Sequence, residues 1–410
     1  MGDGLDAALG RLDADALARD VAALVQVPSV TGDERAALER LGELAEALGL
    51  RADLHRHDLE ALRAHPDHPG EEGPRTELLG LTVAVPGTRD DGPRLALNGH
   101  VDVVPPGTAA WRHGPWSGVI ADGFVWGRGA VDMKGAVVAA LHALGALGDR
   151  APHGEAVLLA VSSEEDGGLG TFAALERDSA FDACLIPEPT GFDVVCAQAG
   201  SIVFEGVVEG VSAHAAHRLE GVSAIDRYVP VHAALAGHER AMNADVAHPL
   251  MRELELPYPL VVGKVGAGEW PSTVPDRLVF AGRAPVRVGE SLDEARAAVE
   301  AVVAAAGDGA ASVRWRGGQF APGETPADDP FAVLVRDAVS AERGAPARVA
   351  GVPWGADMRL FCARGIPCVM VGPRGIELAH AVDERVRVED LLSVARTILR
   401  VAWGFSSRPA

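Results

Sequence analysis

Residues 155–166 read EAVLLAVSSEED. The run from Ala156 to Val161 is apolar throughout and has the length of a strand that is buried on both faces. Two serines and three acidic residues follow it directly, so polar side chains begin where the strand ends. This pattern is typical of a central strand in a parallel sheet that helices cover.

Strand and helix patterns alternate on both sides of this stretch. Short apolar runs predict further strands at 81–85, 94–98, 181–186 and 367–371. Apolar residues at helical spacing predict helices at 131–147, 170–177, 331–342 and 388–403. The alternation predicts the α/β class, with a mostly parallel sheet that carries helices on both faces.

The pattern changes between residues 198 and 317. Ser201–Val208 is rich in strand-forming residues, a helical pattern follows from about Ala224 to Asn243, and two strands and a helix complete the segment. This order is typical of a small α+β domain. The sequence therefore predicts one α/β domain made of two segments, 1–197 and 318–410, that is interrupted by a smaller α+β domain at 198–317. Residues 64–75, rich in His, Pro and Gly, predict an exposed loop.

Composition excludes several classes of partner. The 410 residues carry a formal net charge of −21, which repels nucleic acid and anionic lipid. The longest nearly apolar run, Gly135–Gly148, is shorter than the ~20 residues of a membrane span. The acidic start at Met1–Asp6 lacks the basic and apolar regions of a signal peptide, and the four cysteines show no CxxC spacing. These features predict a cytoplasmic protein with reduced thiols, and neither nucleic acid nor membrane as a partner.

Side chains that can ligate metal follow several predicted strands. In a parallel sheet these positions meet beyond the carboxyl ends of the strands. One carboxylate there is more often a helix cap or a surface charge, but clustered acids repel one another unless a cation neutralises them. Two imidazoles and three carboxylates suit zinc and related ions, and they make two three-ligand sites if one carboxylate bridges. The candidates are His100, Asp132, Glu165, Glu188 and His380. Glu164, adjacent to Glu165, is left free to act as a general base.

Five motifs follow one another along nearly the whole chain: GHVDVVP at 99–105, GRGAVDMKG at 127–135, SEEDGGLG at 163–170, EPT at 188–190 and AH at 379–380. Together they resemble the M20 dinuclear zinc amidohydrolases. This family includes acetylornithine deacetylase, succinyl-diaminopimelate desuccinylase, aminoacylases and carboxypeptidases of the glutamate-releasing type. The resemblance implies that the two-segment domain is catalytic and holds two divalent metal ions, zinc with cobalt as the alternative.

The resemblance also implies roles for single residues. One metal would be held by His100, Asp132 and Glu188, and the other by Asp132, Glu165 and His380. Glu164 would be the catalytic base, and Asp102 the carboxylate that orients His100. The peptide between Asp132 and Met133 would be cis.

The inserted domain resembles the lid and dimerisation domain of the same family. GVSAHAA at 210–216 resembles a motif whose histidine, here His214, would reach the partner subunit's site and help to hold the oxyanion. Ser272 stands where many members have a substrate-binding asparagine, and Arg283 and Pro285 depart from an Asp-x-Arg pattern. A substrate carboxylate could be clamped by Arg359 or Arg374, although ion pairing at the surface explains either arginine equally well.

These residues and the resemblance together predict a hydrolase that cleaves the amide bond of an N-acyl amino acid or a related small N-acyl amine, with Glu164 as the base on a metal-activated water. The resemblance also implies a homodimer. The alternatives are a dipeptidase or carboxypeptidase of the same family, and a non-catalytic binding protein. A third alternative is a dinucleotide-dependent oxidoreductase, because Gly168–Ala173 reads GLGTFA after a strand. The acidic residues at 164–166 disfavour it, since they would repel a pyrophosphate.

Overall fold

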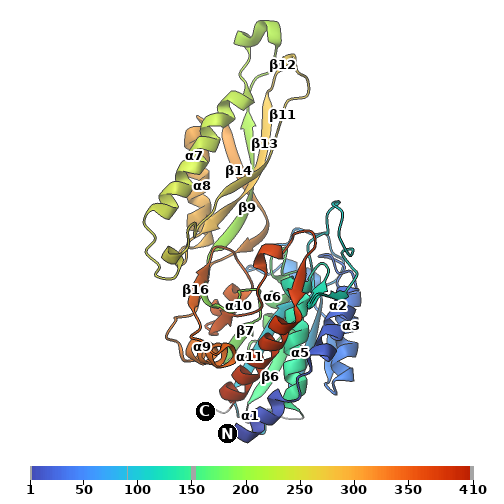
Figure 1. The fold of residues 1–410 in the computed structure, drawn as a ribbon. Helices are drawn as coiled ribbons and strands as arrows, with labels where there is room; N and C mark the ends of the chain where they lie inside the picture. The colour runs from blue at the N-terminus through green and yellow to red at the C-terminus, as the bar shows by residue number, and fades with distance from the viewer. Residues whose placement is uncertain (1, 90, 149–153, 407–410) are drawn as a thin grey trace. The chain divides into compact units, whose positions relative to one another are not determined.

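The chain is seen in a computed structural model that describes residues 2–89, 91–148 and 154–406 (Figure 1). It divides into two compact units. The first comprises Met1–Cys196, Glu324–Ala350 and Leu360–Ala410, and the second comprises Ala197–Gly323 and Gly351–Arg359.

The largest sheet has nine strands. Its central neighbours β6, β3, β7 and β17 are parallel, whereas β1–β2, β2–β6 and β17–β8 pair antiparallel. The expected parallel arrangement thus describes the centre of the sheet, and the strands outside it reverse direction. The spatial order is β1 (Ala52–Arg56), β2 (Leu79–Val85), β6 (Glu155–Val161), β3 (Arg94–His100), β7 (Ala183–Ile186), β17 (Cys368–Met370), β8 (Val194–Gln198) and β15 (Gly323–Glu324), with β16 (Val349–Val352) beside β8.

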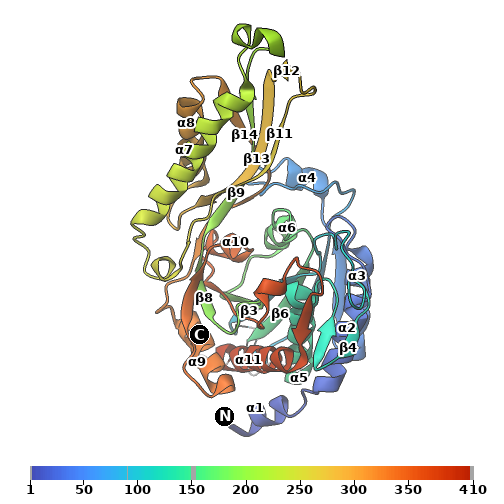
Figure 2. The ribbon, with the colours of Figure 1, turned by 45° about the horizontal axis from the view of Figure 1, so that its top comes forward.

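Helices surround the parallel strands of the first unit (Figure 2). Several begin at a side chain that accepts a hydrogen bond from the first turn, such as Asp13 before α2 and Asp329 before α9. The helices are α1 (Gly2–Leu9), α2 (Ala14–Val25), α3 (Arg35–Ala47), α4 (Leu59–Arg63), α5 (Gly135–Leu147), α6 (Leu169–Arg177), α9 (Pro330–Arg343) and α11 (Val388–Ser406). The residues of α10 (Met358–Cys362) are divided between the two units.

Helices α5 and α6 lie on opposite faces of the sheet. Thr171 of α6 donates a hydrogen bond to Asn98 of β3, whereas a Cβ at Gly99 would lie 2.8 Å from Val137 of α5. Successive residues of a strand point to opposite faces, so the two contacts mark the two faces. The expected helical cover on both faces is therefore present.

Close packing accounts for the glycine-rich segment that resembles a dinucleotide fingerprint. Gly168 precedes α6 with a φ of 76°, and a Cβ at Gly170 would lie 2.0 Å from the carbonyl oxygen of Ser162. These glycines let α6 begin directly against the end of β6.

The stretch Ala130–Leu147, which includes α5, is long and apolar enough to cross a membrane, but 89% of it is buried inside the structure. Helix α5 is apolar on all sides because it packs between the sheet, α2 and α11. The stretch is therefore explained as a core helix.

The second unit has a four-stranded antiparallel sheet. Helices α7 (Ala224–Ala244) and α8 (Leu292–Ala306) contact its strands and each other. The strand order is β11 (Val261–Ala267), β13 (Arg277–Val286), β9 (Gly200–Glu209) and β14 (Ala311–Phe320), and the short strands β10 (Ala213–His214) and β12 (Thr273–Val274) pair separately.

Two reciprocal Phe–Gly pairs fix the middle of this sheet. Phe280 of β13 lies opposite Gly206 of β9, and Phe204 of β9 lies opposite Gly282 of β13. A Cβ at Gly206 would lie 2.0 Å from the Phe280 ring, and one at Gly282 would lie 2.6 Å from the Phe204 ring. Each ring therefore covers a glycine, and the two rings meet edge to face at 6.0 Å in the apolar core.

The second unit differs from the expected insert at 198–317 in two places. Strand β14 stays paired with β9 as far as Phe320, so the unit continues beyond residue 317. Gly351–Arg359, expected in the two-segment domain, belongs to the second unit. The N–H of Ala199 donates to the carbonyl of Val352, which ties this segment to the start of the unit.

Smaller elements complete the chain. A three-stranded sheet in the first unit has the order β18 (Arg385–Arg387), β5 (Phe124–Trp126) and β4 (Val119–Ala121). The short helical turns are η1 (Ala130–Lys134), η2 (Ala215–Glu220), η3 (Met251–Glu253) and η4 (Ile376–Leu378).

Candidate metal centre

His100 ends the central strand β3 and is buried in the first unit. Its Nδ1 lies 2.8 Å from the carbonyl oxygen of Asp102. A carbonyl only accepts, so Nδ1 carries the hydrogen and the lone pair of Nε2 faces the other side. Nε2 lies 3.3 Å from Asp132 Oδ1 and 3.8 Å from Glu188 Oε1. The imidazole is thus oriented as a ligand that shares its surroundings with two carboxylates.

Asp132 lies in η1, directly before α5. The peptide bond between Asp132 and Met133 is cis, as the resemblance implied. Oδ1 of the Asp132 carboxylate faces Nε2 of His100 at 3.3 Å, and Oδ2 of the same carboxylate faces Nε2 of His380 at 3.5 Å. The two oxygens of one carboxylate therefore face two different imidazoles.

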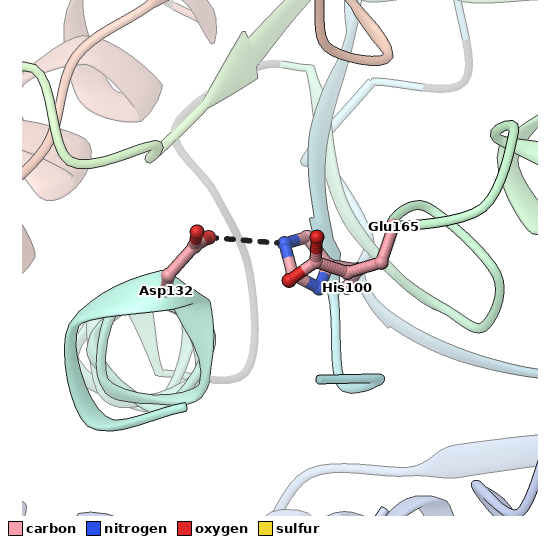
Figure 3. A group of neighbouring side chains, drawn as sticks. All are labelled: His100, Asp132 and Glu165. Carbon is pink, nitrogen blue, oxygen red and sulfur yellow. Dashed lines mark ion pairs between the residues drawn. The ribbon is translucent and has the colours of Figure 1, made fainter. Parts of the chain in front are cut away.

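Glu165 and His380 complete the cluster. Nε2 of His380 lies 3.1 Å from Glu165 Oε1, and the His380 backbone has a φ of 61°, a region that few non-glycine residues adopt. One ligand atom from each of His100, Asp132 and Glu165 lies within 4.8 Å of the others (Figure 3). The five side chains expected as ligands thus occupy one place, beyond the carboxyl ends of β3, β6 and β7.

The carboxylate of Asp102 faces His100 without a hydrogen bond to it. Its carboxylate Oδ1 lies 3.7 Å from His100 Nδ1, beyond hydrogen-bond distance, and the main-chain carbonyl orients the ring instead. The carboxylate accepts hydrogen bonds from the N–H groups of Glu164 and Glu165, at 3.2 and 3.1 Å. Asp102 therefore fixes the turn that carries the expected base and ligand.

The same turn is fixed from its other side. Ser163 has a φ of 66°, and its hydroxyl donates to Asp166. Asp166 also pairs with Arg75 at 3.3 Å, and Arg75 reaches Glu34 at 3.3 Å. These contacts hold Glu164, itself buried, in a rigid loop.

The charges at the cluster compensate one another. Burial opposes a charge on His100, but its contact with Asp132 and the nearby carboxylates raise its pKa well above the usual value. Hydrogen bonds to Asp132 and Glu165 raise the pKa of His380 to about 10. Burial raises the pKa of Asp132, yet the two imidazoles outweigh this and hold it below its usual value. Burial raises the pKa of Glu165. The carboxylates thus attract positive charge to this point, and their oxygen donors with two imidazole nitrogens fit divalent cations.

Two residues beside the cluster have no signal in the sequence analysis above. Glu384 is buried, and its carboxylate accepts hydrogen bonds from the backbone N–H groups of Val131 and Asp132. Arg75 is buried too, although residues 64–75 were expected to be an exposed loop. Its guanidinium compensates acidic neighbours that a linear pattern does not reveal.

The two arginines expected to bind substrate are engaged by neighbouring groups, and the other expected substrate residue, Ser272, belongs to the second unit. Arg374 donates to both carboxylate oxygens of Asp390. Arg359 belongs to the second unit, where it is buried, bonds to the carbonyl of Ala356 and covers the Phe320 ring. Ser272 and His214 are exposed residues of the second unit.

Comparisons with known proteins agree with this arrangement. Residues 96–403 match the model of peptidase family M20/M25/M40. Succinyl-diaminopimelate desuccinylase from Paracoccus denitrificans is 32% identical over 409 residues, which cover 93% of this chain and 96% of the relative.

Solved structures share the fold. A di-peptidase from Saccharomyces cerevisiae has a TM-score of 0.76 at 16% identity, with 100% of both chains covered. A dinuclear metal binding peptidase of the M20 family from Bacillus subtilis has a TM-score of 0.65 at 16% identity, with 95% of this chain and 97% of that chain covered. The chain therefore belongs to peptidase family M20/M25/M40 and is a metal-dependent hydrolase of amide bonds.

Proposed function

We propose that the chain deacylates N-acyl amino acids at a pair of divalent metal ions, zinc with cobalt as the alternative. The observation that carries the proposal is the carboxylate of Asp132, which offers one oxygen toward each of two imidazoles. Site A denotes His100, Asp132 and Glu188. Site B denotes Asp132, Glu165 and His380. Each site has three protein ligands, which leaves room for water and substrate.

Bound cations would supply a Lewis acid that polarises the amide carbonyl and lowers the pKa of water. Glu164 takes the proton from the attacking water and passes it to the nitrogen of the leaving amine. The position of Glu164 supports this role, because Asp102 binds its N–H and that of Glu165 and so keeps base and ligand on one turn.

His214 is proposed to hold the oxyanion in the site of a second copy. The N–H of Ala216 donates to His214 Nδ1 at 3.1 Å, so a neutral ring carries its hydrogen on Nε2. His214 is an exposed residue, and a ring N–H suits an oxygen that gains negative charge. A homodimer through the second unit is supported by its exposed apolar side chains, among them Leu219 at 94%, Val229 at 62% and Val211 at 51% exposure.

An N-succinyl amino acid is the proposed first substrate, because the curated relative at 32% identity is named a succinyl-diaminopimelate desuccinylase. Dipeptides are the second class, favoured by the fold shared with the yeast di-peptidase. The cytoplasm is the proposed location. All four cysteines lie in the described part of the chain and none forms a disulfide there, as is usual in a reducing compartment.

The test is a panel of N-succinyl, N-acetyl and N-formyl amino acids and dipeptides, assayed on protein loaded with zinc or cobalt. The metal content of each sample is measured beforehand by mass spectrometry. We expect the highest kcat/KM with an N-succinyl amino acid and two metal equivalents per chain. If the protein cleaves only dipeptides, dipeptides replace N-acyl amino acids as the substrate class. A metal-loaded protein that cleaves nothing in the panel would refute the proposal.

A further inference from the structure

A buried ion pair lies beside the candidate metal centre. Glu384 Oε2 accepts from Arg128 Nη1 at 2.6 Å, and the side chains are 1% and 3% exposed. The Arg128 guanidinium also lies 5.2 Å from the centre of the Trp111 ring, which covers it with an apolar surface. The short hydrogen bond between two charged groups is a strong one. Because the pair is buried, removing either partner would leave the other as an uncompensated buried charge.

Each member of the pair also binds the backbone of an expected metal ligand. Glu384 Oε1 accepts from the N–H groups of Val131 and Asp132, at 3.0 and 3.3 Å. Arg128 Nη2 donates to the carbonyl oxygen of His380 at 3.1 Å. Hydrogen bonds therefore run without a break from the N–H of Asp132, through the ion pair, to the carbonyl of His380.

The local backbone makes this connection necessary. Asp132 has φ and ψ of −126° and 96°, which are not helical, and the N–H groups of Val131 and Asp132 lie in the first turn of η1, where a helix offers them no acceptor of its own. His380 has a φ of 61° in a segment that is distant in the sequence. Neither segment therefore fixes the distance between the two ligands, and the ion pair joins them directly.

We propose that Glu384 and Arg128 are positioning residues that set the spacing of Asp132 and His380, and thereby the affinity of site B. The inference rests on the proposed pair of cations. Site A depends less on the ion pair, since the carbonyl of Asp102 orients His100 independently. When residues that hydrogen-bond to metal ligands are replaced, the metal affinity typically falls about 10- to 100-fold.

The test measures zinc binding directly, by competition with a chromophoric chelator, and cobalt binding by its visible absorption spectrum. Glu384→Gln keeps the size of the side chain but removes the charge that binds Arg128. We expect it to weaken the zinc equivalent of site B, which is called the second equivalent in this test, about 10- to 100-fold, to alter the cobalt spectrum of site B, and to leave the other equivalent as in the wild type.

A matched control is available at the opposite ends of the same strands. Glu155 is the first residue of β6 and accepts a hydrogen bond at 2.6 Å from Arg94, the first residue of β3, whereas His100 is the last residue of β3. Glu155→Gln should leave both zinc equivalents unchanged. Arg128→Met and the double variant with Glu384→Gln test the link itself. If the pair acts as one unit, the double variant binds the second zinc no more weakly than the weaker single variant.

The outcomes separate this inference from the proposed function. A wild-type protein that binds no second zinc would refute the metal pair and the inference with it. A wild-type protein with two zinc equivalents, together with wild-type affinity in Glu384→Gln, would refute the inference alone. Equal loss of both equivalents with a lower melting temperature would show a merely structural role and would also refute it. If Glu384→Gln does not fold, as judged by circular dichroism, Arg128→Met decides by the same criteria.

Discussion

The first unit buries many charged side chains, whereas the second unit buries almost none. At the carboxyl ends of the central strands the first unit encloses His100, Asp102, Glu164, Asp166 and Glu188. The main core of the second unit is apolar and is built around Phe204, Phe280 and Tyr228. Its only buried charged side chains among the described residues are Asp357 and Arg359.

The difference shows where each unit can tolerate change. Buried charges cost free energy unless ions or hydrogen bonds compensate them, so the first unit gives up stability for a place that attracts cations. An apolar core gains free energy from each buried side chain. Conservative changes at the cluster should therefore affect catalysis more than folding, and changes in the core of the second unit should do the opposite.

The largest effect is expected from Glu164→Gln. The amide has the size of the carboxylate but cannot take a proton from water, and a general base contributes about 10²- to 10⁴-fold. We expect turnover to fall by about that factor while two zinc equivalents remain bound. Steady-state kinetics and metal analysis check this. Glu342→Gln, which alters a nearly buried glutamate of α9 paired with Arg400, is the control and should retain its rate.

The same variant tests the role of the second unit. Glu164→Gln and His214→Ala should each be inactive alone, but a mixed dimer would contain one site with both groups intact. Random pairing after co-expression would then restore about a quarter of the wild-type activity. A co-expressed mixture as inactive as its parents would place His214 outside the partner's site.

A Glu164→Gln protein that keeps most of its rate would remove Glu164 from the mechanism.

The opposite pattern is expected for Phe204→Ala. This side chain is fully buried, covers Gly282 and meets the Phe280 ring, so its truncation leaves a cavity that the antiparallel strands cannot close. Such changes cost about 3–5 kcal/mol. Hydrogen exchange followed by mass spectrometry should show faster exchange in β9 and β13, with zinc content unchanged. Phe204→Leu, which fills most of the space, should lose less. Loss of zinc without faster exchange in those strands would contradict the separation of the two units.

Much of the fold was predictable because its signals are local. Strands β3, β6, β7 and β17 are short apolar runs, and α5 has continuous apolar faces, so length and periodicity identify them. Strand β14 was not predicted. Its outward positions are polar, as at Arg314 and Arg316, and two glycines interrupt its register with β9. What makes it a strand is its pairing with a segment about a hundred residues earlier.

The candidate site divides in the same way. The gathering of the five side chains expected as ligands was predictable because each follows a strand or opens a helix within a recognisable motif. Glu384 and Arg75 were not, because they act through backbone groups and ion pairs that folding alone brings together. Asp102 shows an intermediate case, since its position beside His100 was predicted, whereas the hydrogen bonds of its carboxylate to the 164–165 turn were not.

The smallest effect is expected from a buried group that the site does not use. His57 follows β1, and its Nε2 is buried without a hydrogen-bond partner. Burial, with smaller contributions from His55 and Arg177, lowers its pKa to about 4 from an ordinary 6.5. The unfolded chain therefore binds a proton at His57 more tightly than the folded chain does. As the pH falls from about 6.5 to 4, His57 lowers the free energy of unfolding by at most about 3 kcal/mol. Above pH 7 the imidazole is neutral in both states, and His57 has no effect on the free energy of unfolding. Urea denaturation at several pH values should show that His57→Gln loses this part of the acid sensitivity, whereas His217→Gln, at an exposed position of the second unit, keeps it. An unchanged pH profile in His57→Gln would refute the assignment of this acid sensitivity to His57.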